Sequence, residues 1–354
     1  MTELNQTPRP THLIRKSKER PIEIYLVLLV FAFCLILIAG FRPIGFDRDS
    51  LKYLELYRDY SSFGTANFIQ QEPSFWAIVY LSKLVSNESI RPLFLVYAFL
   101  EIAITTFAIN KLTPYPLSAL ICFAFLFFPL HTMTQIRVGV ACAIFLLTIP
   151  DIVNRRPISF LLKSTLAMAF HYSAIVIFFA YFIKSKNINT KFYLVLPLVG
   201  LFFPLYSYFY DNDLIISAVN SSASFMPIIL GNKIQTYIAL LNMGTGEKIN
   251  LFSFYYIGIL FVYYVTIFNW HKFNSKYDLV FIKLLGWTLF VYYSMSFLPV
   301  ISFRISEIIG ITIIFILPSL MYRFKQKMLI KLSVSLYVLT VFVDNVFVHH
   351  LFNI

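Results

Sequence analysis

A polar stretch between two apolar segments contains side chains suited to acid–base chemistry. From Arg42 to Glu72 the sequence places five acids and four bases, although only 13% of the chain is charged. An ionised side chain that faces lipid at the bilayer centre costs several kcal/mol, so this cluster must lie in water or line a polar cavity. Asp49 and Glu72 are candidate carboxylates for taking a proton from a hydroxyl group.

Three charged or titratable residues interrupt apolar segments elsewhere. Arg137 opens a run of Val, Ala, Ile and Leu, where its donors and free backbone N–H groups can bind phosphate; snorkelling to the interface is the alternative. Arg304 opens another such run, and an ion pair with Glu307, three residues later, is the alternative to ligand binding. His171 can act as a base, or it can be a satisfied structural residue.

Two short patterns in the polar stretch allow more than one interpretation. Asp47 and Asp49 form a DxD, which can hold a divalent metal and a diphosphate, but helix caps and loop salt bridges also explain it. Glu72 precedes Pro73, and proline is favoured at the first position of a helix, so this pair can simply mark a helix start.

The composition predicts an all-α, polytopic transmembrane helical bundle. The chain is 59% hydrophobic and 18% aromatic, against about 45–50% apolar residues in soluble domains. Its repeated apolar runs predict about 9–11 spans. The net charge of +12 comes from bases beside apolar runs, which is typical of membrane orientation and not of nucleic-acid binding. Cys34, Cys122 and Cys142 lie inside apolar runs and predict neither disulfides nor a zinc site.

We expect one integral membrane domain over residues 1–354. Residues 1–21 predict a basic cytoplasmic tail, so the first span carries residues 41–90 to the periplasmic face as the first large loop, and residues 211–250 form the second. Within the first loop, residues 73–86 span about 21 Å as a helix. This is short of the roughly 30 Å hydrocarbon core and predicts a short surface helix.

Residues 157–183 are long for one span, contain His171 near the middle and have bases on both flanks. This pattern predicts a re-entrant hairpin of two short helices with His171 at its tip; simple alternation of full spans is the alternative. With the hairpin, the first polar loop, His171, Arg137 and Arg304 all lie on the outer side. Irregular backbone at membrane depth is tolerated only where protein or water covers it, so the convergence predicts a cavity.

The order and spacing of these residues resemble the EpsG family, the Wzy-like polymerases of bacterial surface-polysaccharide repeat units. The resemblance runs from about Arg42 to Arg304, and it rests on five short segments: Asp49-Ser-Leu-Lys-Tyr53 after Gly45, Glu72-Pro73, Gln135-Ile-Arg137-Val-Gly-Val-Ala141, Phe170-His171-Tyr-Ser-Ala174, and Arg304. It implies an inner-membrane enzyme that joins oligosaccharide repeat units on undecaprenyl diphosphate at the periplasmic face. Family members often have a single Asp where this chain has Asp47 and Asp49, which leaves open which one acts.

The resemblance and the residue chemistry together assign roles to eight side chains. A carboxylate or imidazole takes the proton of the acceptor hydroxyl, arginines stabilise charge on the leaving diphosphate, and aromatic faces hold sugar rings. We expect Asp49, His171 and Glu72 as catalytic residues, Arg137, Arg304 and Arg42 as diphosphate ligands, and Tyr53 and Trp76 as sugar-binding residues. No metal or cofactor is expected, because arginine can bind the phosphates.

The implied partners are the undecaprenyl-diphosphate-linked oligosaccharide, the lipid bilayer, and a flippase and a chain-length regulator of the same pathway; no nucleic acid is expected. Three other interpretations remain at this point. A metal-dependent lipid-linked-sugar glycosyltransferase would use Asp47 and Asp49. A flippase or transporter would bind and release the lipid-linked sugar without making a bond, although the internal repeats common in transporters are not evident. A membrane scaffold would leave the buried His171 unexplained.

Overall fold

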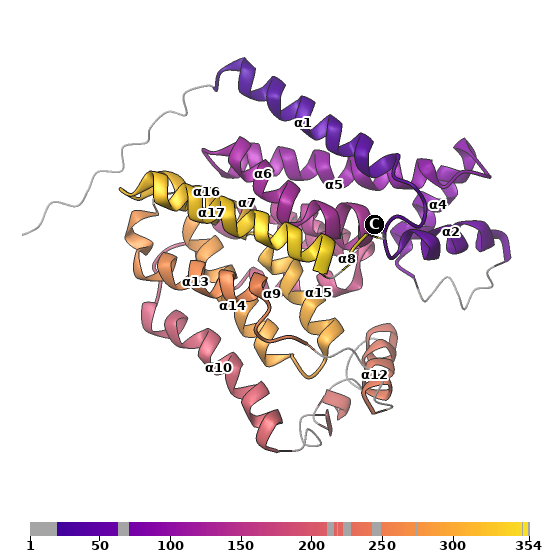
Figure 1. Ribbon diagram of the computed structural model, residues 1–354. Coiled ribbons are helices and arrows are strands. Elements are labelled where there is room, and N and C mark those ends of the chain that lie inside the picture. The colour runs from indigo at the N-terminus through magenta and orange to yellow at the C-terminus, as the bar shows by residue number, and fades with distance from the viewer. Residues whose placement is uncertain are drawn as a thin grey trace, which may run out of the picture.

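The computed structural model is helical throughout the part of the chain that it describes (Figure 1). Outside the helices the described part contains one isolated antiparallel bridge, between Asp47 and Phe352, which brings the first loop beside the C-terminus. The described residues are 20–62, 71–210, 216–217, 219–221, 228–242, 249–273, 275–348 and 350–352.

Fifteen α-helices with described bounds form the bundle. They are α1 (Ile22–Gly40), α2 (Ser50–Arg58), α4 (Pro73–Val85), α5 (Arg91–Leu112), α6 (Pro116–Leu126), α7 (Ile136–Asn154), α8 (Pro157–Phe170), α9 (Ile177–Ala180), α10 (Thr190–Phe209), α12 (Ile228–Asn242), α13 (Phe254–Phe268), α14 (Asp278–Ser294), α15 (Pro299–Gly310), α16 (Ile313–Arg323) and α17 (Lys327–Val343). Shorter helical segments are η1 (Asp59–Ser62), η2 (Phe128–Thr134), η3 (Tyr172–Val176), η4 (Trp270–Lys272) and η5 (Asp344–Val348), of which η2 and η5 are π-helical.

The helix lengths confirm a polytopic membrane bundle. Five described helices are long and apolar enough to cross a bilayer: α1, α5, α7, α10 and α17 with its π-helical extension. Two bent pairs, α6 with η2 and α15 with α16, raise the number to seven if each pair is one span. The sequence predicted more spans, because it also contains the apolar runs that fold into α13 and α14. At 1.5 Å per residue, the 15 residues of α13 and the 17 residues of α14 reach only about 22 and 26 Å.

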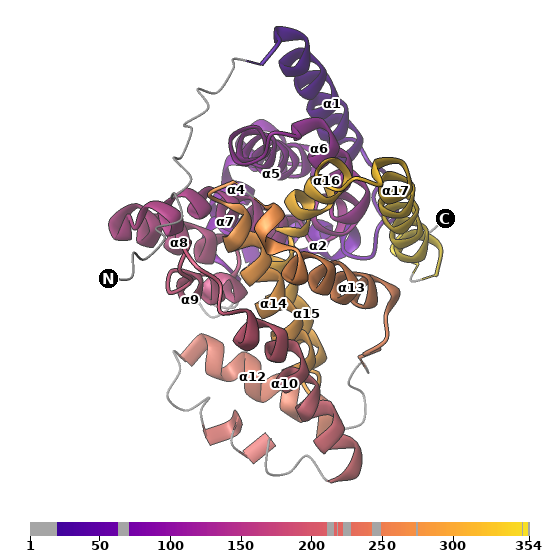
Figure 2. The same cartoon turned by 90° about the vertical axis from the view of Figure 1, so that its left-hand side faces the viewer.

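Helix α7 lies at the centre of the bundle, whereas α1 and α10 lie at its edges. The apolar window of α7 is 78% buried, against 22% for α1 and 17% for α10. Figures 1 and 2 place α1 and α10 on opposite sides of the remaining helices. Lipid therefore covers α1 and α10, and a charged group at the start of α7 must find its partners within the protein.

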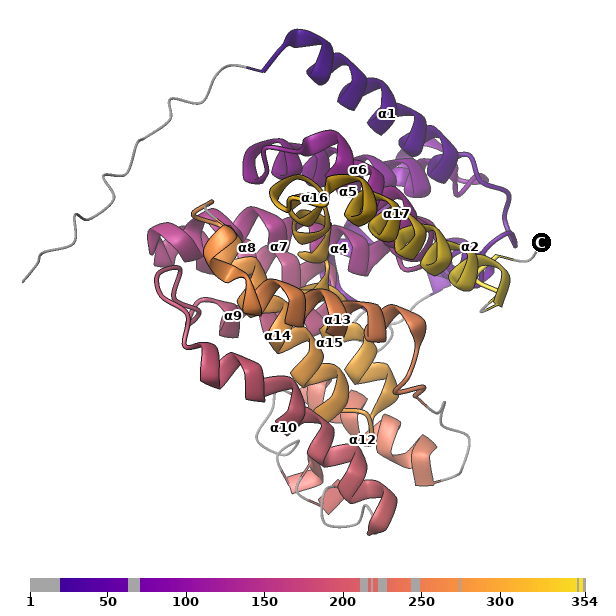
Figure 3. The same cartoon turned by 60° about the vertical axis from the view of Figure 1, so that its left-hand side comes forward.

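The segment after α7 folds as the predicted re-entrant hairpin. Helix α8 ends at His171, which adopts an extended conformation, and the chain returns through η3 and α9 (Figure 3). Arg155, which precedes α8, donates to the backbone oxygen of Ile183 at 2.7 Å and also to that of Tyr181. Because these residues flank the two arms, the chain comes back to the level from which it left.

The start of α1 is attached to the end of α5. Arg20 donates to the backbone oxygen of Thr113 at 2.6 Å and to the side chain of Asn110. The rest of the expected basic tail, residues 1–19, lies outside the described residues, as do residues 63–70 of the first expected loop and much of the second, at 211–215, 218, 222–227 and 243–248. The side of the membrane on which each loop lies stays a prediction.

The hairpin predicts that positions 156 and 186 face the same side of the membrane. Single cysteines there, in a chain whose three native cysteines are replaced, should both react with a membrane-impermeant maleimide from one side. Arg156, Lys186 and Glu88 are all exposed, and a cysteine at position 88, at the other end of the bundle, should react only from the opposite side. Labelling of 156 and 186 from different sides would contradict the hairpin.

Candidate functional site

Glu72 joins three distant parts of the chain in one buried contact. The Glu72 residue is fully buried and forms an ion pair with Arg137, at the start of α7. Its other carboxylate oxygen lies 3.0 Å from Nδ1 of His171, at the tip of the hairpin. The side chain of Gln71 accepts a second bond from Arg137, at 2.5 Å. The contact therefore connects the first polar loop, the central helix and the hairpin.

Each of these side chains lies at a helix end, where the chain can bring a polar group to the same place without exposing it to lipid. Glu72 is the extended N-cap of α4, with Pro73 at the first helical position. His171 is the C-cap of α8. Two further bonds dock the hairpin tip on the start of α4: Ser74 donates to the Ala169 backbone oxygen at 2.7 Å, and Tyr172 donates to that of Gln71 at 3.2 Å.

A small cavity of about 40 Å³ adjoins this contact. Five of the eight residues predicted from the sequence line it, together with two that were not assigned a role. The lining residues are Asp49, Tyr53, Gln135, Arg137, Val138, His171 and Arg304. Glu72 lies behind them. The oxygen of the Gln135 side chain is buried and has no hydrogen-bond partner in the described part of the chain, so it is available to a ligand.

Asp49 and Arg304 face the cavity without the partners that hold the other charges. Within the described residues neither side chain forms a hydrogen bond or an ion pair, and both are partly buried. Burial raises the pKa of Asp49, while the positive charge of Arg304 opposes this shift and the negative charge of Asp47 adds to it. The site thus combines a carboxylate that can take a proton with a guanidinium that can meet an anion.

The sequence left open an ion pair between Arg304 and Glu307, and the structure does not contain it. A carboxylate oxygen of Glu307 instead lies 3.8 Å from Nε2 of His131, which is fully buried on η2. Arg304 and Glu307 are three residues apart on α15, where such pairs commonly form. The partner of Glu307 therefore comes from a separate segment, η2, and not from its own helix.

Arg42 lies apart from the cavity, although the sequence placed it among the diphosphate ligands. Its side chain is buried, donates to Asp47 at 2.8 Å and to the Ala39 backbone oxygen at 2.6 Å, and lies over the Phe94 ring. The other carboxylate oxygen of Asp47 accepts the backbone N–H of Ser50 at 2.9 Å. Arg42 and Asp47 thus hold the start of α2, and Asp49 is the carboxylate of the DxD that reaches the cavity.

Of the two aromatic residues predicted to bind sugars, one lines the cavity and the other does not. Tyr53 lines the cavity, and the guanidinium of Arg137 lies 5.8 Å from the centre of its ring. Trp76 is buried against Phe75 and Tyr60 and is not among the lining residues. Its large aromatic surface contributes to the packing of α4.

Gln71 and Gln135 are the polar site residues to which the sequence assigned no role. Each lies within two positions of a predicted site residue, and each is a neutral polar group in a region of strong charges. No three His, Cys, Asp or Glu side chains gather to hold a metal ion in the described ranges. The side chain of Asp47 pairs with Arg42, whereas that of Asp49 lines the cavity, so the two carboxylates of the DxD have different surroundings.

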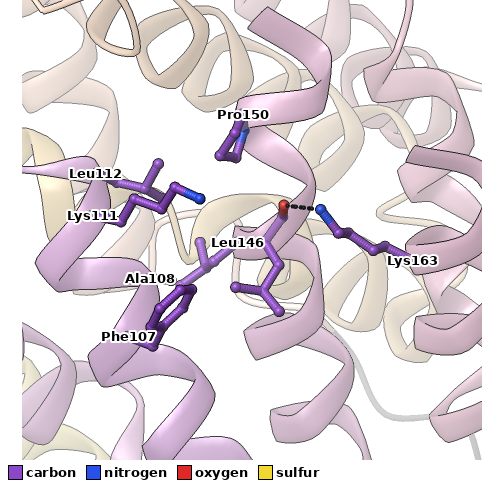
Figure 4. Close-up of a pocket in the computed structure, with 8 residues that line it drawn as sticks. Phe107, Ala108, Lys111, Leu112, Leu146, Pro150 and Lys163 are labelled. Carbon is purple, nitrogen blue, oxygen red and sulfur yellow. Dashed lines mark hydrogen bonds between the residues drawn. The ribbon is translucent and has the colours of Figure 1, made fainter. Parts of the chain in front are cut away.

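A second cavity, of about 130 Å³, lies near the other end of α5 and α7 (Figure 4). Its wall is mainly apolar, with Lys111 and Lys163 on opposite sides. Lys163 is already engaged: it donates to the Leu147 backbone oxygen at 3.2 Å and pairs with the buried Asp151 at 2.6 Å. This cavity lacks an available carboxylate, and the Lys163–Asp151 pair attaches α8 to α7.

Comparison with known proteins gives one family match. The model of the EpsG family matches residues 25–353, which is nearly the whole chain and includes every residue of the cavity. Comparisons with curated proteins and with solved structures returned no match.

The separation of Asp47 from Asp49 predicts opposite effects on stability at neutral pH. Asp47→Asn breaks the buried pair with Arg42 and should lower the melting temperature in detergent by roughly 3–5 °C. Asp49→Asn should leave it equal or higher. A carboxyl whose pKa is raised by folding stabilises the fold below its unfolded pKa, and this contribution is lost as pH rises through the folded pKa.

The pH dependence provides the control for this comparison. The difference in melting temperature between Asp49→Asn and the wild type should shrink as the pH falls towards about 3.9, the pKa of an aspartate in the unfolded chain. Melting curves of both variants across this range measure the effect. A neutral-pH destabilisation by Asp49→Asn as large as that by Asp47→Asn would contradict the assignment.

Proposed function

The chain belongs to the EpsG family, and on that premise we propose that it is a membrane glycosyltransferase that polymerises undecaprenyl-diphosphate-linked oligosaccharide repeat units. The observation that carries the proposal is the cavity in which Asp49 and Arg304 lie without ion-pair partners among the described residues, beside Arg137. Glycosyl transfer from a lipid diphosphate requires these two chemical functions, a base and a stabiliser of leaving-group charge.

In the proposed reaction, the acceptor hydroxyl oxygen attacks the anomeric carbon of the donor's first sugar. The bond between that carbon and the diphosphate oxygen breaks, and its electron pair leaves with the lipid diphosphate. The hydroxyl proton passes to the protein base. Arg304 and Arg137 stabilise the charge that develops on the leaving diphosphate, and they do so in surroundings with little competing water.

Asp49 is the proposed base. His171 is the second candidate, but its Nδ1 already contacts Glu72, and Glu72 also holds Arg137. We propose that Glu72 and His171 orient Arg137 and close one wall of the cavity. Asp49, by contrast, has no competing side-chain partner in the described residues, and its raised pKa reflects a carboxylate that readily accepts a proton.

At about 40 Å³, the cavity is much smaller than the roughly 300–1,000 Å³ of ordinary small-molecule pockets. We propose that only the reacting groups enter it, while the sugars and the lipid extend beyond its mouth. Tyr53 is the aromatic side chain placed to contact the first sugar. Trp76 has no such position in the proposed site, because it is packed inside the protein.

The distribution of bases supports an inner-membrane orientation with a cytoplasmic N-terminus and a periplasmic cavity. Arg137 begins α7 at the cavity, and Arg155 follows its end, about 28 Å away along the axis. Arg20, Arg155 and Lys163 gather at that far end with the partners described above. Clusters of bases mark the cytoplasmic side. A flippase and a chain-length regulator of the same pathway are the proposed partners.

Deletion of this protein should leave the surface glycan one repeat unit long, because repeat units are still made and transferred to their final acceptor. Electrophoresis of the extracted glycan, followed by complementation with the intact chain, measures this. An undiminished ladder of long chains in the deletion strain would contradict the proposal. Accumulation of lipid-linked units on the cytoplasmic side would instead indicate a flippase.

Arg137→Lys should reduce polymerisation almost as strongly as Arg137→Ala, by about a hundredfold in rate. One terminal nitrogen of Arg137 is used by Glu72 and Gln71, while Nε is buried and has no partner in the described residues. Lysine can pair with Glu72, but its single ammonium cannot also provide the planar fork that binds a diphosphate. Chain length and the rate of repeat addition in membranes measure the loss.

Arg155→Lys is the matched control, because Arg155 flanks the other end of α7 and bonds only backbone oxygens in the described structure. It should keep near-normal chain length. All variants must be compared at equal abundance in the membrane, since a destabilised protein imitates a catalytic defect. A fully active Arg137→Lys protein would show that Arg137 only anchors α7 and pairs with Glu72.

A further inference from the structure

A buried pair outside the cavity involves His131 and Glu307. His131 is fully buried and Glu307 is 9% exposed; Nε2 of His131 and a carboxylate oxygen of Glu307 are 3.8 Å apart, and neither atom has a hydrogen-bond partner in the described residues. Neither side chain lines the cavity. The proposed reaction does not use them, yet Glu307 lies one helical turn beyond Arg304 on α15. The pair is therefore adjacent to a residue that the site requires.

Arg304 would ordinarily pair with Glu307. Residues three apart on a helix are neighbours, and an arginine and a glutamate at this spacing attract each other. The attraction is stronger where little water is present. In the structure Glu307 is directed to His131, and Arg304 has no ion pair within the described residues. On the cavity side, the positive charge of Arg304 acts on Asp49.

The position of His131 is set by the backbone that also starts α7. His131 belongs to the π-helical segment η2, in which the Gln135 N–H donates to the Leu130 backbone oxygen at 2.7 Å. The backbone N–H of His131 donates to the Phe127 oxygen at 2.7 Å, and the two rings lie 5.2 Å apart. Single-turn π-helical segments are frequent at functional sites. Here the segment carries His131 on one side and leads directly to Gln135 and Arg137 of the cavity.

We propose that His131 is a positioning residue that holds Glu307 away from Arg304 and so keeps Arg304 available to the anionic substrate. The inference rests on the proposed function, because it takes Arg304 as a diphosphate ligand. If Glu307 turned to Arg304, the guanidinium would be neutralised before the substrate arrives. The donor would then have to displace a carboxylate, which raises its KM more than it lowers kcat.

The test is a double-mutant cycle with His131→Leu, Glu307→Gln and the two combined. His131→Leu should raise the KM for the lipid-linked donor by about tenfold, a typical coupling for neighbouring charged groups. Glu307→Gln should stay near wild type, because a neutral amide does not neutralise the charge of Arg304. The double variant should return to the level of Glu307→Gln. If His131 had only a structural role, a change in Glu307 would not restore the KM of His131→Leu.

A double variant as impaired as His131→Leu would overturn the inference, and so would a His131→Leu protein with normal KM. If His131→Leu does not accumulate in the membrane, His131→Asn takes its place, since asparagine keeps a polar side chain but does not reach Glu307. It should show the same rise in KM and the same rescue.

Arg304→Ala, measured in parallel, separates this inference from the proposed function. Loss of polymerisation in Arg304→Ala together with a silent His131→Leu would overturn the positioning role alone. Full polymerisation by both Arg304→Ala and Arg137→Ala would remove the proposed diphosphate site itself, and with it the basis for a role of His131.

Discussion

The arrangement of this bundle depends on the need to satisfy one buried carboxylate. Glu72 is fully enclosed, and an ionised carboxylate without partners inside a protein would be strongly destabilising. Its partners come from α7 and from the hairpin tip, so the start of α4 is held against both. The same contact fixes the guanidinium of Arg137 and the imidazole of His171 at the cavity wall. Packing and site geometry are thus set by one interaction.

Two further pairs lie near this end of the bundle. Arg42 and Asp47 form an ion pair before the start of α2, and Glu307 lies beside His131. Among the Asp, Glu, Lys and Arg residues that line the cavity, Asp49 and Arg304 form no ion pair with a described residue. A site that binds a diphosphate needs charged groups without internal partners, because each internal partner competes with the substrate for the same charge. The functional assignment rests on this distinction between satisfied and available groups.

The other end of the bundle has a different composition. Arg20, Arg155 and Lys163 bond to backbone oxygens, and Lys163 also pairs with Asp151. These contacts close the hairpin and attach α1 and α8 to their neighbours. Between the two ends, α7 is almost entirely apolar and buried. The helix therefore separates a polar, acid-containing end from a basic end by about the thickness of a hydrocarbon core.

The sequence alone determined the membrane class, the EpsG family, the hairpin and five of the seven residues that line the cavity. In a chain so apolar, a charge within an apolar segment is costly, so Arg137, His171 and Arg304 could be identified by their surroundings, and Asp49 by its place in the polar stretch after the first span. Only the tertiary structure decided which partner each charge takes. Asp47 and Asp49 are alike in sequence, but the fold of the loop between α1 and α2 pairs Asp47 with Arg42 and leaves Asp49 at the cavity. Glu307 is well spaced for Arg304 on α15, but the structure places it beside His131 of η2. Contacts between separate segments set that partner, and spacing along one helix does not encode them.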